Sequence, residues 1–319
     1  MTNPLTTAQL GRTGLEVTSI CAGGSVLGSM PSVFSYTYSE AQAIETVLAL
    51  LGSGINFLDT SAGYSDGESE RRIGLAIAEA GGLPAGFIVA SKADPDPRTG
   101  DFSGAQVRRC AEESLARLGL DQLPLYYLHD PERMDFADSM RPDGPVAALV
   151  RLREEGIVGA IGVAGGPVEV EDRYLRTDLF DVLLTHNRYT LLDQSAGQII
   201  AYAHARGMGV VNAAPFGGGI LAKGSAGARR YAYQPAADHL LSQLTELERL
   251  CRDFHTELAA VALQFSLRDP RITSTVVTMS SPARIRETLA LAAVAVPGAL
   301  WSALPRPAGQ LDRDLPAGG

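Results

Sequence analysis

The segments FIVASK at 87–92 and LYYLH at 125–129 are two strand-like runs that enclose a helical pattern, and this unit decides the fold. Between them, Ser103 and Gln106 have the spacing of a capping box, which marks the start of a helix. Gly119 marks its end. The residues that recur at helical spacing are apolar or small: Val107, Cys110, Ala111, Ser114, Leu115 and Leu118. Strand, helix and strand in this order predict a βαβ unit with parallel strands.

The same alternation repeats along the whole chain. Further strand-like runs lie at 17–22, 55–59, 158–163, 180–185, 208–214 and 275–278. Helices are predicted between and after these runs. They start at Ser39 (a capping box with Gln42), Ser69, Val146, Val168, about 236, about 256 and Pro282. A further helix is predicted to follow a cap at Asp193. The strands are apolar on both faces, as parallel strands covered by helices are. Eight such units in roughly 290 residues predict an α/β fold, a single (β/α)₈ TIM barrel.

The domain organisation follows from this count. We expect one barrel domain at 1–304 and a mobile C-terminal tail at 305–319, where proline, glycine and charge dominate. The alternative is a doubly wound open sheet, which normally carries a G-x-G-x-x-G fingerprint after its first strand. The stretch CAGGSVLG at 21–28 is rich in glycine but does not keep that spacing. The barrel is therefore favoured.

The composition excludes several classes of partner. Acidic residues number 36 and basic residues 27, a net charge of −9, which disfavours bulk binding to nucleic acid or anionic membrane. The three cysteines, Cys21, Cys110 and Cys251, are too few and too scattered for a disulfide framework or a metal cluster. The N-terminus lacks a secretory signal pattern, and the most apolar stretch, 289–301, is too short to span a bilayer. We expect a soluble, cytoplasmic protein with buried thiols and no metal.

Four polar side chains close successive strands or follow them directly. Asp59 ends the second strand, Tyr64 lies five residues later, Lys92 ends the third and His129 ends the fourth. One such residue is often only a solvated strand end or a helix cap. In a barrel, however, the carboxyl ends of adjacent strands meet at one mouth, where the chemistry of this fold takes place. We therefore expect the four side chains to form one site.

These residue types suit proton transfer. A tyrosine with its ordinary pKa of about 10 is a poor base near neutral pH, but a nearby ammonium favours the phenolate. A carboxylate keeps that ammonium charged and aimed, and a histidine beside the tyrosine can hydrogen-bond a substrate oxygen. None of the four is a strong hydride acceptor. Redox chemistry at this site would need a cofactor.

The segments FLDTSAGY at 57–64, ASK at 90–92 and YLH at 127–129 resemble the catalytic segments of the aldo-keto reductase family. LGRTGLEV at 10–17 and GLAI at 74–77 extend the resemblance, which covers roughly residues 10 to 300. It implies a (β/α)₈ barrel that binds NAD(P)(H) at the strand ends and acts on a small molecule. The family would make Tyr64 the general acid/base, with Lys92 and Asp59 tuning it and His129 orienting the substrate.

Within that family, two further segments are similar to aldose 1-dehydrogenases of the L-fucose, D-threo-aldose or galactose type. They are THNRYTLLDQSA at 185–196 and NAAPFGGGIL at 212–221, and the same group is similar to pyridoxal 4-dehydrogenase. The implied reaction oxidises the anomeric hydroxyl of a sugar to a lactone, with Tyr64 taking the hydroxyl proton. The partner would be a sugar or aldehyde, and the protein a monomer or homodimer.

The resemblance also implies a set of cofactor contacts, several of which depart from the common pattern. Where the family often has Ser-Asn, Gln and an aromatic residue near the nicotinamide, this chain has Ala164-Gly165, His186 and Ala213. Glycine amides near the pyrophosphate and residues after the last strand would complete the site. NAD and NADP both remain open, because the usual Lys-Ser after the last strand is replaced. The expected contacts beyond these three sites are Ala214, Pro215, Phe216, Gly217, Gly218, Gly219, Lys223, Thr278, Met279, Ser280 and Arg284.

Other interpretations stay open at this stage. An aldehyde or ketone reductase would use the same tetrad in the reverse direction. A nucleotide-binding regulatory barrel would not need it, and a Schiff-base aldolase would need an unpaired Lys92. Candidate substrate contacts are Phe34, Tyr36, Tyr38 and Trp301, each with packing as the alternative role, and the polar groups Asp130 and Arg188 near the mouth.

Overall fold

Eight parallel strands close into a barrel in this computed structural model, which describes residues 5–29, 31, 37–227, 229–232 and 234–305. The order around the barrel is β12-β3-β4-β5-β6-β7-β8-β9. The strands are β3 (Ile20–Gly23), β4 (Phe57–Asp59), β5 (Ile88–Ala93), β6 (Leu123–His129), β7 (Val158–Gly165), β8 (Val182–His186), β9 (Gly209–Ala213) and β12 (Ser274–Thr278). The predicted (β/α)₈ barrel is confirmed. Apart from Pro305, the tail expected at 305–319 lies outside the described residues.

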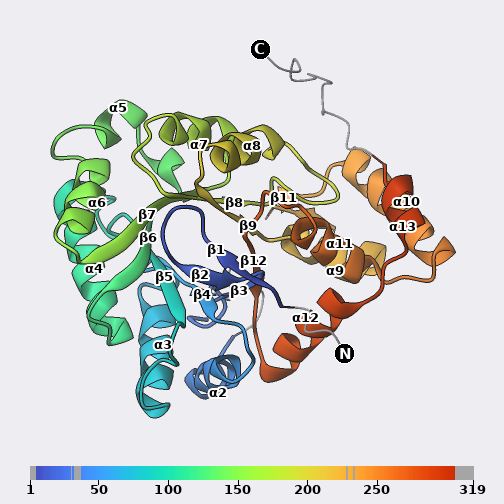
Figure 1. The fold of residues 1–319 in the computed structure, drawn as a ribbon, viewed down its shortest axis with the longest axis horizontal. Helices are drawn as coiled ribbons and strands as arrows, with labels where there is room; N and C mark the ends of the chain where they lie inside the picture. Colours follow the sequence, from blue (N-terminus) through green and yellow to red (C-terminus); the bar gives the residue numbers. More distant parts are fainter. Residues whose placement is uncertain (1–4, 30, 32–36, 228, 233, 306–319) are drawn as a thin grey trace.

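Helices cover the outside of the barrel (Figure 1). The longer ones are α2 (Glu40–Leu51), α3 (Glu68–Glu79), α4 (Gly104–Leu118), α6 (Pro145–Glu154), α7 (Val168–Leu175), α8 (Gly197–Ala205), α10 (Asp238–Asp253), α11 (Leu258–Leu267) and α12 (Pro282–Ala293). Short elements fill the connections: η1 (Pro131–Arg133), α5 (Phe136–Ser139), η2 (Gly217–Gly219), α9 (Ile220–Lys223), η3 (Gly224–Ala226), the pair β10 (Arg230–Tyr231) and β11 (Gln234–Pro235), and α13 (Gly298–Ala303).

The helix starts follow the capping chemistry in part. Ser39 and Gln42 form the complete reciprocal capping box, and Pro282 occupies the first turn of α12. Ser103 accepts from the Gln106 amide, but the Gln106 side chain donates to the Asp94 carbonyl, so this box is only half formed. The cap expected at Asp193 is wrong. Its carboxylate accepts from the Ser195 amide in a preceding turn, and α8 begins later without a side-chain cap.

An N-terminal hairpin closes the amino end of the barrel and corrects the strand expected at 17–22. Strands β1 (Thr7–Gln9) and β2 (Glu16–Thr18) pair with each other, so the barrel strand starts only at Ile20. The hairpin turn reaches the amino end of β9 through a bridge from Gly11 to Met208, and it lies across the barrel in Figure 1. Three exposed residues in β1 carry no apolar alternation, which is why the sequence pattern missed the hairpin.

Two of the three hydrophobic clusters among the described residues lie on opposite sides of the barrel wall, and the third lies under α9, α10 and α11. Adjacent residues of β6 show the division, because successive strand side chains point to opposite faces. Tyr127 belongs to the interior cluster with Phe57 and Val211, whereas Tyr126 packs in the layer between the strands and the helices. The three cysteines are free and buried, as expected. Buried polar side chains outside the site, such as Glu70, Glu171 and Asn212, are hydrogen-bonded to neighbouring side chains.

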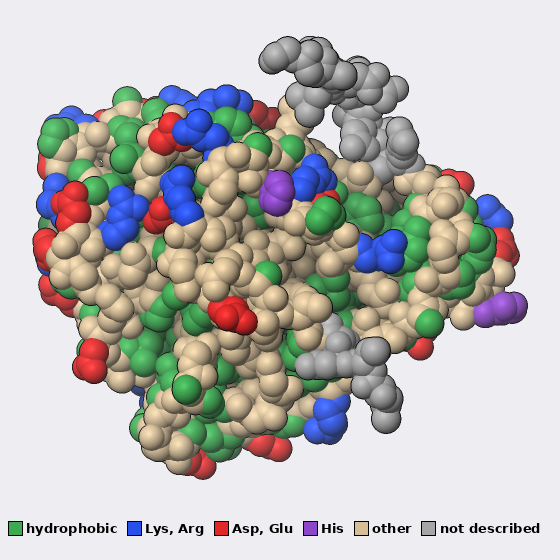
Figure 2. All heavy atoms as spheres, viewed as in Figure 1, with side chains coloured by type: hydrophobic (Ala, Val, Ile, Leu, Met, Phe, Trp, Pro, Cys, Tyr) green, Lys and Arg blue, Asp and Glu red, His purple; other side chains and the backbone are tan. Residues whose placement is uncertain are grey.

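The surface and the helices bear on possible partners. Figure 2 shows acidic and basic side chains interspersed near the edge of the face viewed, without a broad field of one sign. Among the described residues, no helix combines the length and the apolar character that crossing a membrane requires.

Gly74 supplies a stability test at the crossing of α3 and α4. A methyl group there would overlap the main-chain oxygen of Arg117. Alanine improves helix propensity by about 1 kcal/mol, but overpacking against backbone costs about 1–3 kcal/mol. We therefore expect Gly74→Ala to lower the midpoint of urea unfolding. The control is Gly52→Ala at the end of α2, where a Cβ would meet only the Ala49 carbonyl oxygen at 3.9 Å, so the midpoint should stay nearly unchanged. An unchanged midpoint in both variants would contradict the packing argument.

Candidate active site

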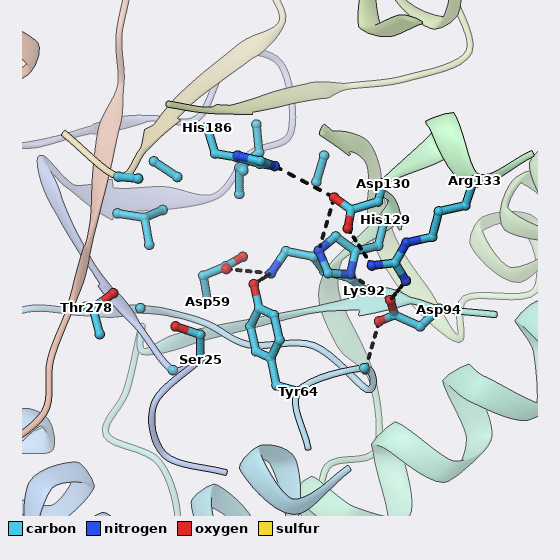
Figure 3. A pocket seen from close by; sticks show the side chains of 18 residues that line it. Ser25, Asp59, Tyr64, Lys92, Asp94, His129, Asp130, Arg133, His186 and Thr278 are labelled. Atoms are coloured by element: carbon cyan, nitrogen blue, oxygen red, sulfur yellow. Dashed lines mark hydrogen bonds and ion pairs between the residues drawn. The ribbon is translucent and has the colours of Figure 1, made fainter. Parts of the chain in front are cut away.

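The carboxyl ends of the strands surround a cavity of about 300 Å³ at the mouth of the barrel. All four residues expected from the sequence line it: Asp59, Tyr64, Lys92 and His129. Figure 3 shows Tyr64 and Lys92 pointing toward each other, with His186 on the far side. Parallel barrels carry out their chemistry at this end, because loops that can vary in length and sequence extend there from a rigid wall of strands.

Lys92 is the centre of a buried polar chain. Its ammonium donates to Asp59 Oδ1 at 2.5 Å and to the Thr60 carbonyl at 2.6 Å. It also lies 3.4 Å from the hydroxyl of Tyr64, whose side chain is half-buried. Lys92 and Asp59 are almost fully buried. A buried ammonium is tolerated when it is paired and hydrogen-bonded in this way.

The charge state of the pair follows from burial and attraction together. Burial works to lower the pKa of Lys92, but the Asp59 carboxylate and the Tyr64 oxygen raise it above its ordinary value. Burial raises the pKa of Asp59, and Lys92 opposes that rise. Near neutral pH the lysine is therefore a cation held beside Tyr64. This disfavours the Schiff-base aldolase, which needs a neutral, unpaired amine.

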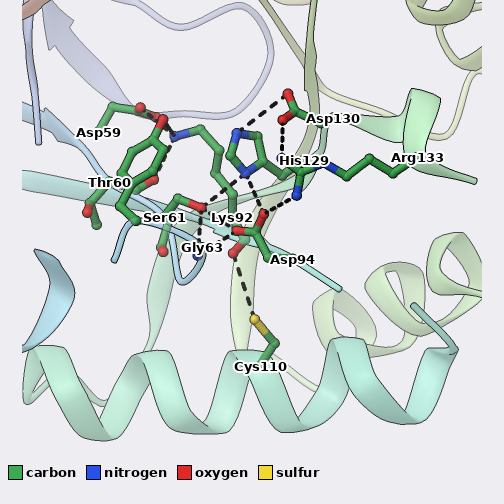
Figure 4. Close-up of polar contacts among 12 residues, drawn as sticks. Asp59, Thr60, Ser61, Gly63, Lys92, Asp94, Cys110, His129, Asp130 and Arg133 are labelled. Atoms are coloured by element: carbon green, nitrogen blue, oxygen red, sulfur yellow. Dashed lines mark hydrogen bonds and ion pairs between the residues drawn. The ribbon is translucent and has the colours of Figure 1, made fainter. Parts of the chain in front are cut away.

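His129 is held from behind by a carboxylate that the sequence analysis did not single out. Its Nδ1 lies 2.8 Å from Asp94 Oδ1 and 3.1 Å from Ser61 Oγ (Figure 4). The other oxygen of Asp94 accepts from the Ser61 hydroxyl and, at 2.8 Å, from the Gly63 amide. Burial raises the pKa of Asp94, but His129 and these donors more than reverse that and hold it below the ordinary value. His129 also meets the Tyr64 ring edge-on.

A signal for Asp94 was present in the sequence. Strand residues two apart share a face, so the inward position of Lys92 places Asp94 inward as well. Both residues are buried near the end of β5 or directly after it. The role of Ser61 had no comparable signal, because it depends on the conformation of the loop after β4.

A second polar group forms the rim. The Asp130 carboxylate receives Arg133 at 2.7 Å and lies 3.7 Å from Nε2 of both His129 and His186. Burial raises the pKa of Asp130, but His186, His129 and Arg133 lower it well below its ordinary value. Asp130 has a left-handed backbone, with φ at 42°, which is uncommon for a residue other than glycine. The strained turn directs its side chain into the cavity.

The expected cofactor residues fall into two groups. Ala164, His186, Ala214 and Thr278 line the cavity, together with Ala213. Gly165 ends β7 beside them. The others follow β9 or β12, which are neighbouring strands, but they do not line this cavity: Pro215, Phe216, Gly217, Gly218, Gly219, Lys223, Met279, Ser280 and Arg284.

The loop after β9 has the shape that close approach of a phosphate requires. Gly217, Gly218 and Gly219 all have positive φ. A Cβ on Gly218 would meet nothing nearer than 3.8 Å, and one on Gly219 would meet nothing within 4 Å. Open space beside consecutive left-handed glycines fits an anion held by main-chain amides. The residues present therefore fit a dinucleotide.

The other substrate candidates divide as follows. Tyr38 is buried, and its hydroxyl lies 2.6 Å from the Ser280 carbonyl, so it packs rather than lining the cavity. Phe34 and Tyr36 lie outside the described residues. Arg188 donates to the Gly166 carbonyl at 3.0 Å. Trp301 lies on α13 and packs against the Arg268 guanidinium, and it does not line the cavity.

Comparisons with known proteins agree with this site. A model of the aldo/keto reductase family matches residues 19–303. D-threo-aldose 1-dehydrogenase of a Pseudomonas species is 30% identical and covers 91% of this chain and 94% of its own length. L-galactose dehydrogenase of Arabidopsis thaliana is 31% identical and covers 88% of this chain and 86% of its own length. Pyridoxal 4-dehydrogenase of Microbacterium luteolum is 28% identical over 92% and 95%.

A solved structure shares the fold. The holo form of an aldo-keto reductase from Bacillus halodurans aligns with a TM-score of 0.76 at 22% identity, covering 96% of this chain and 99% of that one. The family match spans most of the barrel, including the four polar strand-end residues. The chain therefore belongs to the aldo/keto reductase family of oxidoreductases, which implies a nicotinamide cofactor and a small carbonyl substrate.

Proposed function

We propose that this enzyme oxidises the anomeric hydroxyl of an aldose of the L-fucose, D-threo-aldose or galactose type to a lactone, with NAD(P)⁺ as oxidant. The observation that carries the proposal is the buried chain Asp59–Lys92–Tyr64, which opens into a cavity rimmed by carboxylates and histidines. Two sugar dehydrogenases among the relatives support it. A sugar offers many hydroxyl donors, and this rim offers acceptors to meet them.

Tyr64 is the proposed general base. The Lys92 ammonium stabilises the phenolate that takes the hydroxyl proton, and Asp59 keeps the ammonium charged and fixed. When bound, the oxidised nicotinamide supplies the acceptor for the hydride from C1. His129 stands beside Tyr64 and orients the substrate. The protein's part is to place these groups and to move one proton.

The cofactor contacts are proposed from the two loops that leave β9 and β12. The glycine turn at 216–219, in which the Gly217 and Gly219 amides already donate to the Ala214 and Phe216 carbonyls, would let the pyrophosphate approach the main chain, and the Lys223 ammonium would pair with it. Ala164, Gly165, His186, Ala214 and Pro215 would surround the nicotinamide, with His186 as a side chain able to reach its carboxamide. The start of α12, with Thr278, Met279, Ser280 and Arg284, would hold the adenosine end.

A reductase acting in the other direction is the second candidate, because a tyrosine that accepts a proton can return it. Because one relative is a pyridoxal 4-dehydrogenase, pyridoxal is also a candidate substrate. A regulatory barrel is less favoured, because a nucleotide sensor has no use for the buried Lys92–Asp59 pair beside Tyr64.

The substrate assignment is tested by following nucleotide absorbance at 340 nm. Aldoses and pyridoxal would be supplied with NAD⁺ or NADP⁺, and simple aldehydes with NADH or NADPH. We expect sugars of the L-fucose and galactose type to give the highest kcat/KM. Turnover of aldehydes without any sugar oxidation would replace the dehydrogenase proposal with the reductase.

Tyr64→Phe tests the general base. The change removes only the hydroxyl, and loss of a general acid/base typically costs 10²–10⁴-fold in rate. We expect kcat to fall by at least about 10²-fold, while the Kd for the nucleotide, read from protein fluorescence, stays within about twofold. The matched control is Tyr202→Phe, at a partly buried ring on α8 under Arg176, which should keep full activity. Full activity of the Tyr64 variant would exclude it as the base.

Arg284→Ala tests the contact with the adenosine end. Arg284 lies in the first turn of α12, where its only described ion pair is with Glu287. A lost charge contact to a 2′-phosphate should raise KM for NADP⁺ about tenfold and leave KM for NAD⁺ almost unchanged. Arg286→Ala, an exposed change on the same helix, should alter neither. Equal effects on both nucleotides would remove Arg284 from 2′-phosphate recognition.

A further inference from the structure

The proton on His129 can be located from its neighbours. Asp94 is an ionised carboxylate, and both of its oxygens can only accept hydrogen bonds. Ser61 has a single hydroxyl proton, and it donates this proton to Asp94 Oδ2. Toward the histidine, Ser61 Oγ can therefore only accept.

Both groups that face Nδ1 of His129 are thus acceptors. Asp94 Oδ1 lies 2.8 Å away and Ser61 Oγ lies 3.1 Å away. Nδ1 must carry a proton to meet them, and in the neutral ring Nε2 is then left with a lone pair. The tautomer is fixed by the protein rather than by the substrate.

Nε2 is the ring nitrogen left for the ligand. It lies 3.7 Å from Asp130 Oδ1, which is beyond hydrogen-bond range, and His129 lines the cavity. Arg133 binds the other oxygen of Asp130 at 2.7 Å and so offsets its charge. A lone pair and a carboxylate oxygen side by side can accept hydroxyl hydrogens.

We propose that Asp94 is a positioning residue that holds His129 as the Nδ1–H tautomer, so that Nε2 accepts a hydrogen bond from a substrate hydroxyl. This rests on the proposed function for the sugar, but the tautomer is a property of the free enzyme. The accepted hydroxyl lies next to the reacting one, whose proton goes to Tyr64. The site then selects hydroxyl-rich substrates through a residue that does not need to touch them.

Asp94→Asn should reverse the tautomer with little change in shape. The Gly63 amide, an obligatory donor at 2.8 Å from Oδ2, fixes the oxygen of the new amide on that side. The NH₂ group then replaces Oδ1, which in the unaltered protein also accepts from the exposed Arg133 guanidinium at 3.5 Å, so that guanidinium has to turn toward Asp130. The NH₂ group faces His129 and donates to Nδ1, which moves the ring proton to Nε2. The pocket would present a donor where it had presented an acceptor. Asp96→Asn is the matched control, because Asp96 lies in the same loop and its carboxylate accepts from the Arg98 and Thr99 amides and forms an ion pair with the Arg98 side chain at 3.7 Å.

The first measurement is ¹⁵N NMR of the histidine rings, with a His129→Gln variant to assign the signals. In the neutral-ring limit, we expect Nδ1–H at His129 in the unaltered enzyme and in Asp96→Asn, and Nε2–H in Asp94→Asn. An Nε2–H ring in the unaltered enzyme overturns the proposal, whether or not any sugar is turned over. So does an unchanged tautomer in Asp94→Asn.

The second measurement uses the best sugar and its monodeoxy derivatives. We expect Asp94→Asn to lower kcat/KM by about 10–100-fold, as loss of a supporting partner typically does, with nucleotide Kd within about twofold. With the unaltered enzyme, one deoxy sugar should show a kcat/KM lower by a similar factor. With Asp94→Asn, the same deoxy sugar should react almost as well as the full sugar, because the variant has already lost the hydrogen bond that this hydroxyl makes. Strictly additive losses for every deoxy sugar would mean that Asp94 acts only on the fold, and would overturn the proposal.

Discussion

The ion pair between Lys92 and Asp59 is the interaction around which the mouth of the barrel is arranged. It places two opposite charges inside the apolar wall, where the cost of desolvating them offsets much of the attraction between them. Well-packed apolar residues would often serve stability equally well. One oxygen of Asp59 is buried without a hydrogen-bond partner in the structure, a further cost. We infer that the pair is retained for the charge it holds 3.4 Å from the Tyr64 hydroxyl rather than for folding.

One short loop connects this pair to the second carboxylate. In residues 60–64, the Thr60 carbonyl receives Lys92, the Ser61 hydroxyl and Gly63 amide bind Asp94, and Tyr64 ends the loop. Gly63 has to be a glycine here, because a Cβ would come within 2.7 Å of the Asp94 carboxylate. The proton acceptor and the group that orients the histidine are therefore placed by the same five residues. A change in this loop would disturb both together.

The parts that the sequence predicted are those that depend on local periodicity. Alternating strands and helices gave the barrel, and the rule that strand ends converge brought Asp59, Lys92 and His129 together. The hairpin β1–β2 was missed because its first strand is exposed and only three residues long. Asp193 failed as a cap because an aspartate also stabilises turns. Ser61 was missed because its contacts join the loop after β4 to Asp94, directly after β5, and to His129 at the end of β6, which no local pattern encodes.

Two histidines face the same carboxylate, and their neighbours favour opposite proton placement in the neutral rings. The Asn187 amide nitrogen lies 3.1 Å from Nδ1 of His186, which favours a proton on the Nε2 of that ring, 3.7 Å from Asp130. At His129 the acceptors beside Nδ1 favour the proton there, which leaves Nε2 of the neutral ring bare. The rim therefore offers a donor on one side of Asp130 and an acceptor on the other. A hydroxyl can both donate and accept, whereas a carbonyl oxygen can only accept. Such an arrangement matches an alcohol on both sides, which favours a substrate with several hydroxyl groups.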